Sequence, residues 1–124
     1  QVLGPVSNQD VSLSLTQLGV FAADLDARLK AKYADMDVLM FGHIGDNNLH
    51  VVAYTGRAED KALINIDIMR MIGEYAGAIT AEHGVGVNKK DFLDQSRSPE
   101  EIALMRTLKH AMDPKGILNP GRVI

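Results

Sequence analysis

Residues 38–54, VLMFGHIGDNNLHVVAY, decide the fold because two apolar runs flank a segment that favours turns. The first run covers residues 38–41 and the second covers residues 49–54. Residues 45–48 between them are Gly, Asp, Asn and Asn, which are common in tight turns. This arrangement predicts a β-hairpin.

The segments on either side of the hairpin predict further strands and helices. Apolar and polar residues alternate over residues 10–15, which indicates a half-buried strand, and Thr16 is expected to cap the helix that follows. Helical spacing predicts a long helix over residues 58–79, followed by a loop at residues 80–90. The fold class predicted from this order is α+β, a mostly antiparallel sheet with helices packed on one face.

A last helix is predicted to begin at Ser98, where Pro99 and Glu101 complete a capping box. Its apolar residues recur at helical spacing and are expected to form a buried stripe. They are Ile102, Met105, Leu108 and Met112.

The composition indicates one globular domain and excludes several functional classes. The 124 residues are 46% hydrophobic and 23% charged, which argues against disorder and coiled coils. Thirteen basic against sixteen acidic residues give a net charge of −3, which argues against a nucleic-acid partner. The absence of cysteine excludes disulfides and thiolate metal sites.

Two histidines flank the predicted turn. If Asp46 and Asn47 form its centre, His43 and His50 lie directly opposite each other, on the same face of the hairpin. Their Cβ atoms would then be roughly 4.5–5.5 Å apart, which allows both imidazoles to bind one divalent ion. The alternative is a pair of half-buried histidines that are hydrogen-bonded to the backbone.

A carboxylate and a third imidazole, Glu82 and His83, lie next to each other at the start of the predicted loop. Alone they are also typical of a solvated helix end. Together with the two hairpin histidines, Glu82 would complete a three-ligand site with open coordination positions, and His83 would be free to act as a general base. Lys89 and Lys90 could attract a substrate carboxylate or form a solvated basic turn.

Four segments, in order, resemble motifs of the C-terminal domain of FAD-linked oxidases. Residues 42–50, GHIGDNNLH, resemble its GHxGDGNxH motif, and residues 82–89, EHGVGVNK, resemble EHGxGxxK. Residues 113–122, DPKGILNPGR, resemble its terminal DPxgilNPGK, and residues 10–13, DVSL, resemble one of its strands. The family includes glycolate oxidase D subunits, D-lactate dehydrogenases and D-2-hydroxyglutarate dehydrogenases, and the resemblance implies a ferredoxin-like part of its fold.

The resemblance implies an FAD-dependent enzyme that oxidises a D-2-hydroxy acid to the 2-keto acid. His43, His50 and Glu82 match the family's ligands for a divalent metal, zinc or manganese-like. His83 matches the catalytic base, which takes the hydroxyl proton while hydride leaves for the flavin.

Further motif positions imply substrate and cofactor contacts. Asn48 and Lys89 are expected to bind substrate, and Asn119 is expected to bind FAD.

Some positions depart from the family pattern. Asn47 stands where the family has Gly, and Arg122 stands where it has Lys. Val52 and Asn8 replace an Asn and a basic residue that hydroxyglutarate-type members use for the distal carboxylate. These two replacements speak against a dicarboxylic substrate and leave a smaller or more apolar acid open.

The resemblance also implies that residues 1–124 form a single, partial C-terminal domain, without the N-terminal domain that mainly holds FAD. Alone, the chain is expected neither to retain FAD nor to turn over substrate. Its expected partners are a small 2-hydroxy acid and the FAD-binding domain. Apolar surface left uncovered is expected to favour a homo-oligomer. The expected location is the cytoplasm, with peripheral membrane attachment of the intact enzyme left open.

Two other functions remain open on the sequence. One is a stand-alone, non-catalytic domain of α+β fold that binds metal or oligomerises. The other is a different enzyme with two histidines and a carboxylate, such as a metal-dependent hydrolase or a non-haem iron oxygenase.

Overall fold

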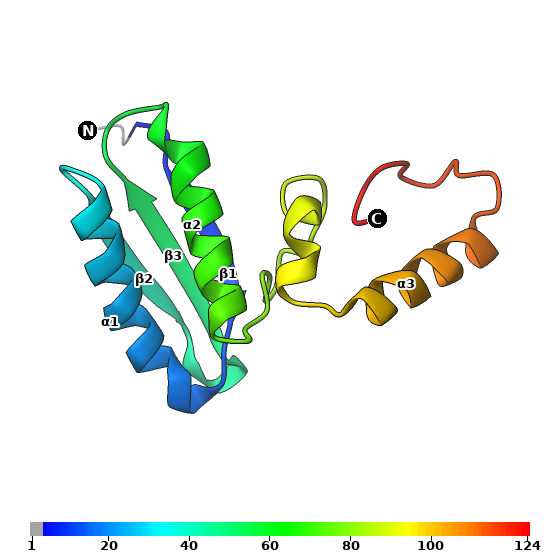
Figure 1. Ribbon diagram of the computed structural model, residues 1–124, viewed down its shortest axis with the longest axis horizontal. Coiled ribbons are helices and arrows are strands. Elements are labelled where there is room, and N and C mark those ends of the chain that lie inside the picture. Colours follow the sequence, from blue (N-terminus) through cyan, green and yellow to red (C-terminus); the bar gives the residue numbers. More distant parts are fainter. Residues whose placement is uncertain (1–3) are drawn as a thin grey trace.

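The computed structural model describes residues 4–124 (Figure 1). Its elements in chain order are β1 (Ser7–Ser12), α1 (Leu15–Lys32), β2 (Asp37–His43), β3 (Asn48–Tyr54), α2 (Asp60–Glu74) and α3 (Pro99–Met112). Two short 3-10 helices, Ile44–Asp46 and Lys90–Gln95, lie in the connections.

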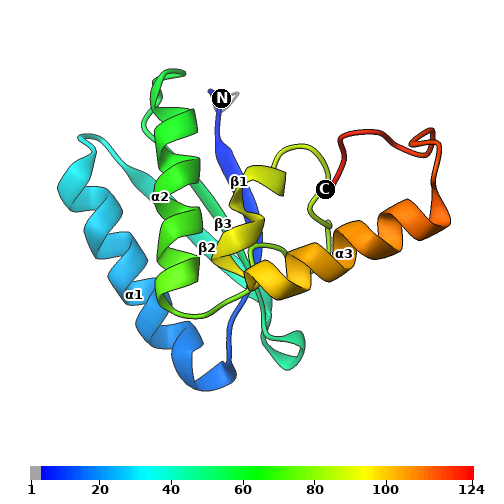
Figure 2. The same ribbon diagram turned by 45° about the vertical axis from the view of Figure 1, so that its right-hand side comes forward.

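The three strands form one antiparallel sheet in the order β1-β3-β2. Helices α1 and α2 lie side by side on one face of it (Figures 1 and 2), which confirms the predicted α+β class. The order β-α-β-β-α, with β1 beside β3, corresponds to the first five elements of a ferredoxin-like fold. At the end of β1, Ser12 forms an isolated antiparallel bridge with Ala78, and the loop over residues 79–89 follows directly after this bridge.

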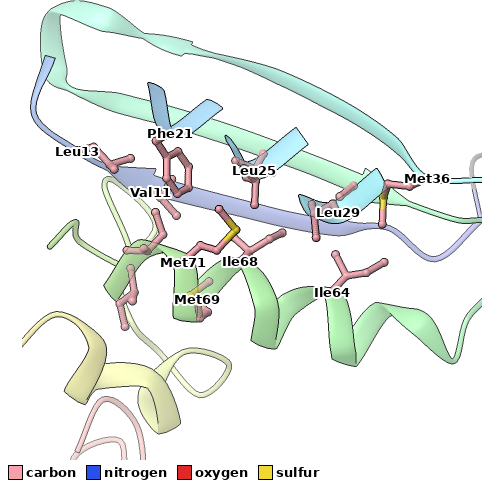
Figure 3. Packing of buried hydrophobic residues seen from close by; sticks show 14 of the residues in the cluster. Val11, Leu13, Phe21, Leu25, Leu29, Met36, Ile64, Ile68, Met69 and Met71 are labelled. Atoms are coloured by element: carbon pink, nitrogen blue, oxygen red, sulfur yellow. The ribbon is translucent and has the colours of Figure 1, made fainter. Parts of the chain in front are cut away.

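Alternation along β3 separates the core from the opposite face of the sheet. Val51 and Ala53 are fully buried beneath the helices. Figure 3 shows apolar side chains of α1 and α2 packed against this face. The largest fully buried side chains of these two helices are Phe21, Leu25, Leu29, Ile64, Ile68, Met69 and Ile72. Asn48, His50 and Val52 point to the other face, so polar groups placed there do not disturb the core.

The first strand and helix begin earlier than the sequence predicted. β1 covers Ser7–Ser12, and the N-cap of α1 is Ser14 where Thr16 was expected. Leu13 enters the core, but Leu15 already lies on the helix with 56% of its surface exposed. The alternation over residues 10–15 therefore continued past the true end of the strand.

The long helix predicted over residues 58–79 is shorter. α2 ends at Glu74, because Ala76 adopts a left-handed conformation with φ of 52°. Gly77 then passes close to β1, where an added Cβ would lie 2.8 Å from the Ser12 carbonyl oxygen. Only glycine allows the backbone to approach this closely. Gly77 therefore lets the chain pass from the end of α2 to the edge of the sheet.

The capping box of α3 is confirmed, but its buried stripe is wrong. The Ser98 hydroxyl accepts a hydrogen bond from the Glu101 N–H, and the Glu101 carboxylate accepts one from the Ser98 N–H. No residue of α3 is buried, and Leu108 and Met112 are 53% and 82% exposed. The helix projects away from the sheet (Figures 1 and 2). It contacts the 3-10 helix Lys90–Gln95, which leaves Ile102 and Met105 half-buried.

Asp113 holds the turn after α3, and this contact is expected to depend on pH. Its buried carboxylate accepts hydrogen bonds from Lys109 Nζ and from the N–H groups of Ile117 and Leu118. Chiefly the Lys109 ammonium, and then the Leu118 N–H, lower the pKa of Asp113 below 3.8. The pKa of Asp113 is therefore lower in the folded state than in the unfolded state. The contact stabilises the turn fully above pH 3.8, the ordinary pKa, and is lost as the pH falls through the folded-state pKa.

We therefore expect the amide signals of Ile117 and Leu118 to titrate with a midpoint below 3.8 in nuclear magnetic resonance spectra. In Asp113→Asn this step should disappear. A midpoint at or above the ordinary value of an aspartate would contradict the assigned contact.

Candidate functional site

Three potential metal ligands converge on the sheet face that the helices leave uncovered. His43 ends β2, His50 lies within β3, and Glu82 lies in the loop after α2. One donor atom of each lies within 4.8 Å of the other two. His43 Nδ1 is 2.8 Å from Glu82 Oε1, and the two histidine rings meet edge to face with centroids 5.6 Å apart.

The predicted direct pairing of the two histidines is wrong by two residues. His43 pairs with Asn48, and His50 pairs with Phe41. The turn is a 3-10 helix over Ile44–Asp46. Asn47 follows it in a left-handed conformation with φ of 58°, which Asn tolerates better than most residues and which explains why Asn can stand at this position in place of Gly. A shift of two residues keeps side chains on the same face, so the histidines still converge, now along a diagonal.

Asn48 lies beneath the three ligands and is only 2% exposed. Its Nδ2 donates to Glu82 Oε1 and lies 3.4 Å from both His43 Nδ1 and His50 Nε2. The hydrogen bonds from His43 and then Asn48 lower the pKa of Glu82, so the carboxylate is anionic at neutral pH. This burial leaves Asn48 better placed to orient Glu82 than to meet a substrate directly.

His83 stands next to the ligands, beside a carboxylate that the sequence did not single out. Its ring centroid is 5.8 Å from that of His50, and its Nδ1 lies 3.3 Å from Asp10 Oδ1. Asp10 pairs directly with His50 across the β1–β3 ladder and is fully buried. The signal available in the sequence was an acidic residue within an alternating strand, which alone predicts only an outward-facing side chain.

Lys89, predicted to bind substrate, is buried and engaged within the protein. Its Nζ donates to the Asp10 carboxylate, to the Asp10 carbonyl oxygen at 3.0 Å and to the Ile79 carbonyl oxygen at 2.8 Å. These contacts use all three ammonium protons, so Lys89 offers none to a substrate in this arrangement. Lys90 donates to the Gly121 carbonyl oxygen at 3.1 Å.

Asn119, predicted to bind FAD, lies in the C-terminal tail. The tail is tied to the loop by a hydrogen bond of 2.9 Å from the Val123 N–H to the Gly86 carbonyl oxygen. Asn119 is exposed and lines, with Gly86 and Arg122, an open cavity of about 710 Å³. Its role toward the flavin stays a prediction.

The donor set fits a divalent metal ion. Two imidazole nitrogens and one carboxylate oxygen are typical of catalytic zinc sites, whose ligands at about 2.1 Å from the ion lie roughly 3.4 Å from one another. The three donor atoms are already within 4.8 Å of each other, so small side-chain rotations would bring them to that spacing. Three protein ligands leave open positions for substrate oxygens.

Residues 2–123 match the family described as FAD linked oxidases, C-terminal domain. The chain belongs to this family. The match covers all four motif segments, residues 10–13, 42–50, 82–89 and 113–122.

Several D-2-hydroxyglutarate dehydrogenases are similar to this FAD-linked oxidase domain. That of Stutzerimonas stutzeri (strain A1501) is 40% identical over 121 residues, which cover 92% of this chain and 26% of the relative. The mitochondrial enzymes of Arabidopsis thaliana and Bos taurus are 39% and 40% identical, and the matches cover 100% and 98% of this chain and 22% of each relative. The chain therefore spans about a quarter of the length of these relatives.

Two further expectations concern location and assembly. Among residues 4–124, no helix has the length and apolar character needed to cross a bilayer. The relatives from Arabidopsis thaliana and Bos taurus are named as mitochondrial, so a cytoplasmic location stays a prediction. The homo-oligomer also stays a prediction; Leu39 and Phe41, which are 60% and 53% exposed on the open sheet face, are consistent with it.

Proposed function

We propose that this chain is the substrate- and metal-binding part of an FAD-dependent dehydrogenase that oxidises a D-2-hydroxy acid to the 2-keto acid. The observation that carries the proposal is the convergence of His43, His50 and Glu82 beside His83 in a domain of the FAD-linked oxidase family. The same proposal includes a separate FAD-binding domain in the intact protein. A stand-alone non-catalytic domain would not need a proton acceptor beside its metal ligands.

The residues divide the chemistry between them. When bound, a divalent cation supplies a Lewis acid that lowers the pKa of the substrate hydroxyl, and FAD accepts the hydride. His43, His50 and the anionic Glu82 would hold the cation. His83 accepts the hydroxyl proton at Nε2, because its Nδ1 faces the buried Asp10 carboxylate.

Two observations favour different substrates within the same class. The names of the relatives favour D-2-hydroxyglutarate. Val52, two residues from His50 on the same face, pairs with Leu39 on one side and Asn8 on the other, and none of these three side chains carries a positive charge for a distal carboxylate. It favours a D-2-hydroxy acid with a small or apolar side chain, such as D-lactate.

The test is an anaerobic titration of the intact protein with each acid. A D-2-hydroxy acid should bleach the oxidised flavin, whereas its L enantiomer should not. Removing the metal with a chelator should abolish bleaching, and zinc or manganese should restore it. The proposal is wrong if no D-2-hydroxy acid reduces the flavin, or if elemental analysis finds no metal and chelation changes nothing.

The side chain at position 52 is expected to tune substrate choice. Val52→Asn supplies an amide next to His50, and the ratio of kcat/KM for D-2-hydroxyglutarate to that for D-lactate should rise about tenfold, since a polar group rewards a substrate that can hydrogen-bond to it. Steady-state kinetics with both acids measure the ratio. Leu104→Asn, on exposed α3, is the control and should leave it unchanged; an unaltered ratio in Val52→Asn would place the substrate side chain elsewhere.

A further inference from the structure

One buried carboxylate, that of Asp10, accepts hydrogen bonds from several residues of the loop that carries Glu82 and His83. Its Oδ2 accepts four hydrogen bonds from consecutive residues of that loop. The donors are Thr80 Oγ1 at 3.0 Å and the backbone N–H groups of Ala81 at 2.9 Å, Glu82 at 2.7 Å and His83 at 2.9 Å.

The second carboxylate oxygen of Asp10 contacts two parts of the same loop, Lys89 at its end and His83 in its middle. Oδ1 accepts from Lys89 Nζ and lies 3.3 Å from His83 Nδ1. Lys89 also donates to the Ile79 carbonyl oxygen, so both ends of the loop over residues 79–89 meet at Asp10. Burial alone would raise the pKa of Asp10, but the His83 N–H and Lys89 lower it well below its ordinary value, so the carboxylate stays ionised.

The position of Asp10 in the sheet makes this arrangement relevant to the site. Asp10 pairs directly with His50 across the β1–β3 ladder, so the loop is fastened beside a metal ligand. The Glu82 backbone is fixed at one side of Asp10, and its carboxylate reaches His43 at 2.8 Å. A loop with no regular secondary structure thereby carries its two functional side chains at a defined distance from the strand histidines.

We propose that Asp10 is the positioning residue of this site: its one carboxylate places Glu82 at the metal ligands and keeps the proton of the His83 imidazole on Nδ1, so that Nε2 is free to accept one. The inference rests on the proposed function for what Glu82 and His83 do, but the placement itself is a property of the metal-free protein. Asp10 touches neither cation nor substrate in this assignment and acts through its neighbours.

The test variant is Asp10→Asn in the intact protein. The amide keeps the shape but has one acceptor oxygen in place of two, and its NH₂ group faces donors. Zinc binding, followed by isothermal titration of the metal-free protein, should weaken by about 10- to 100-fold, the range typical of residues that orient metal ligands. With nitrogen-15-labelled histidine, the His83 signal should move from the Nδ1–H toward the Nε2–H tautomer, and His83→Gln assigns that signal.

The control is Asp60→Asn, which removes another hydrogen-bonded carboxylate. Asp60 accepts from Thr55 and Arg57 beyond the opposite end of β3, so this variant should lose stability without changing zinc affinity or the His83 tautomer. A folded Asp10→Asn protein with wild-type zinc affinity and an unchanged His83 signal would overturn the inference.

If Asp10→Asn does not fold, Thr80→Val removes a single donor to Asp10 and should weaken zinc binding about threefold; no weakening would overturn the inference. If the wild-type protein binds no metal and no acid bleaches its flavin, the proposed function fails. The tautomer of His83 in the metal-free protein then still decides on Asp10, since a shift in Asp10→Asn supports the placement and its absence refutes it.

Discussion

Replacing His83 with glutamine is expected to lower kcat by about 10²- to 10⁴-fold, the usual contribution of a positioned general base. The reason is that His83 is the imidazole beside the ligand cluster whose Nδ1 faces a carboxylate, which leaves Nε2 as the proton acceptor. Stopped-flow measurement of flavin reduction in the intact protein gives the rate. Metal content should stay at the wild-type level, because His83 is not one of the three ligands.

His110→Gln is the matched control for that variant. His110 is an exposed histidine on α3, which projects away from the sheet, and its replacement should leave kcat and KM unchanged. Flavin reduction at an undiminished rate in His83→Gln would remove His83 from the proton-transfer role. A loss of metal in the same variant would instead make His83 a ligand.

Glu82→Gln is expected to weaken zinc binding more than about 100-fold, since it removes a ligand where the loss of an orienting residue already costs 10- to 100-fold. The amide keeps the size of the side chain but not the negative charge that opposes the charge of the cation. Because the carboxylate is ionised at neutral pH, its pKa being lowered by His43 and Asn48, the charge is present in the wild-type protein under assay conditions. Isothermal titration and elemental analysis measure the effect.

Glu74→Gln serves as the control for Glu82→Gln. Glu74 is another exposed carboxylate with a charged partner, Arg28 at 2.7 Å, and it lies at the end of α2. Its replacement should leave zinc affinity unchanged. If Glu82→Gln retains wild-type zinc affinity and metal content, the third ligand must come from another residue.

The hairpin and the common face of its histidines could be predicted from the sequence, although the exact pairing could not. The turn residues gave the hairpin, and a strand period of two kept His43 and His50 on one face despite the two-residue error. The error came from the local conformation of Ile44–Asp46 and Asn47, which sets the centre of the turn. Local propensities do not distinguish turns whose centres differ by one residue.

The roles of Asp10 and Lys89 could not be predicted, because their partners are far away in the chain. The residues that donate to the Asp10 carboxylate lie 70 to 79 positions later. Their meeting depends on how the loop after α2 folds back to the edge of β1. The predicted buried stripe of α3 failed for a related reason: periodicity identifies an apolar side, but not whether anything in the described residues covers it.

The alternation of core and site residues along β3 has a consequence for how this strand can change in evolution. Loss or gain of one residue between Asn48 and Ala53 would move every later side chain of the strand to the opposite face of the sheet. If the change lies between Asn48 and His50, Val51 and Ala53 would turn away from the helices, and His50 would enter the space beneath them. Substitutions can alter either side of the strand independently, but a deletion or an insertion damages hydrophobic packing and chemistry at once, so the number of residues in β3 should vary less than their identity.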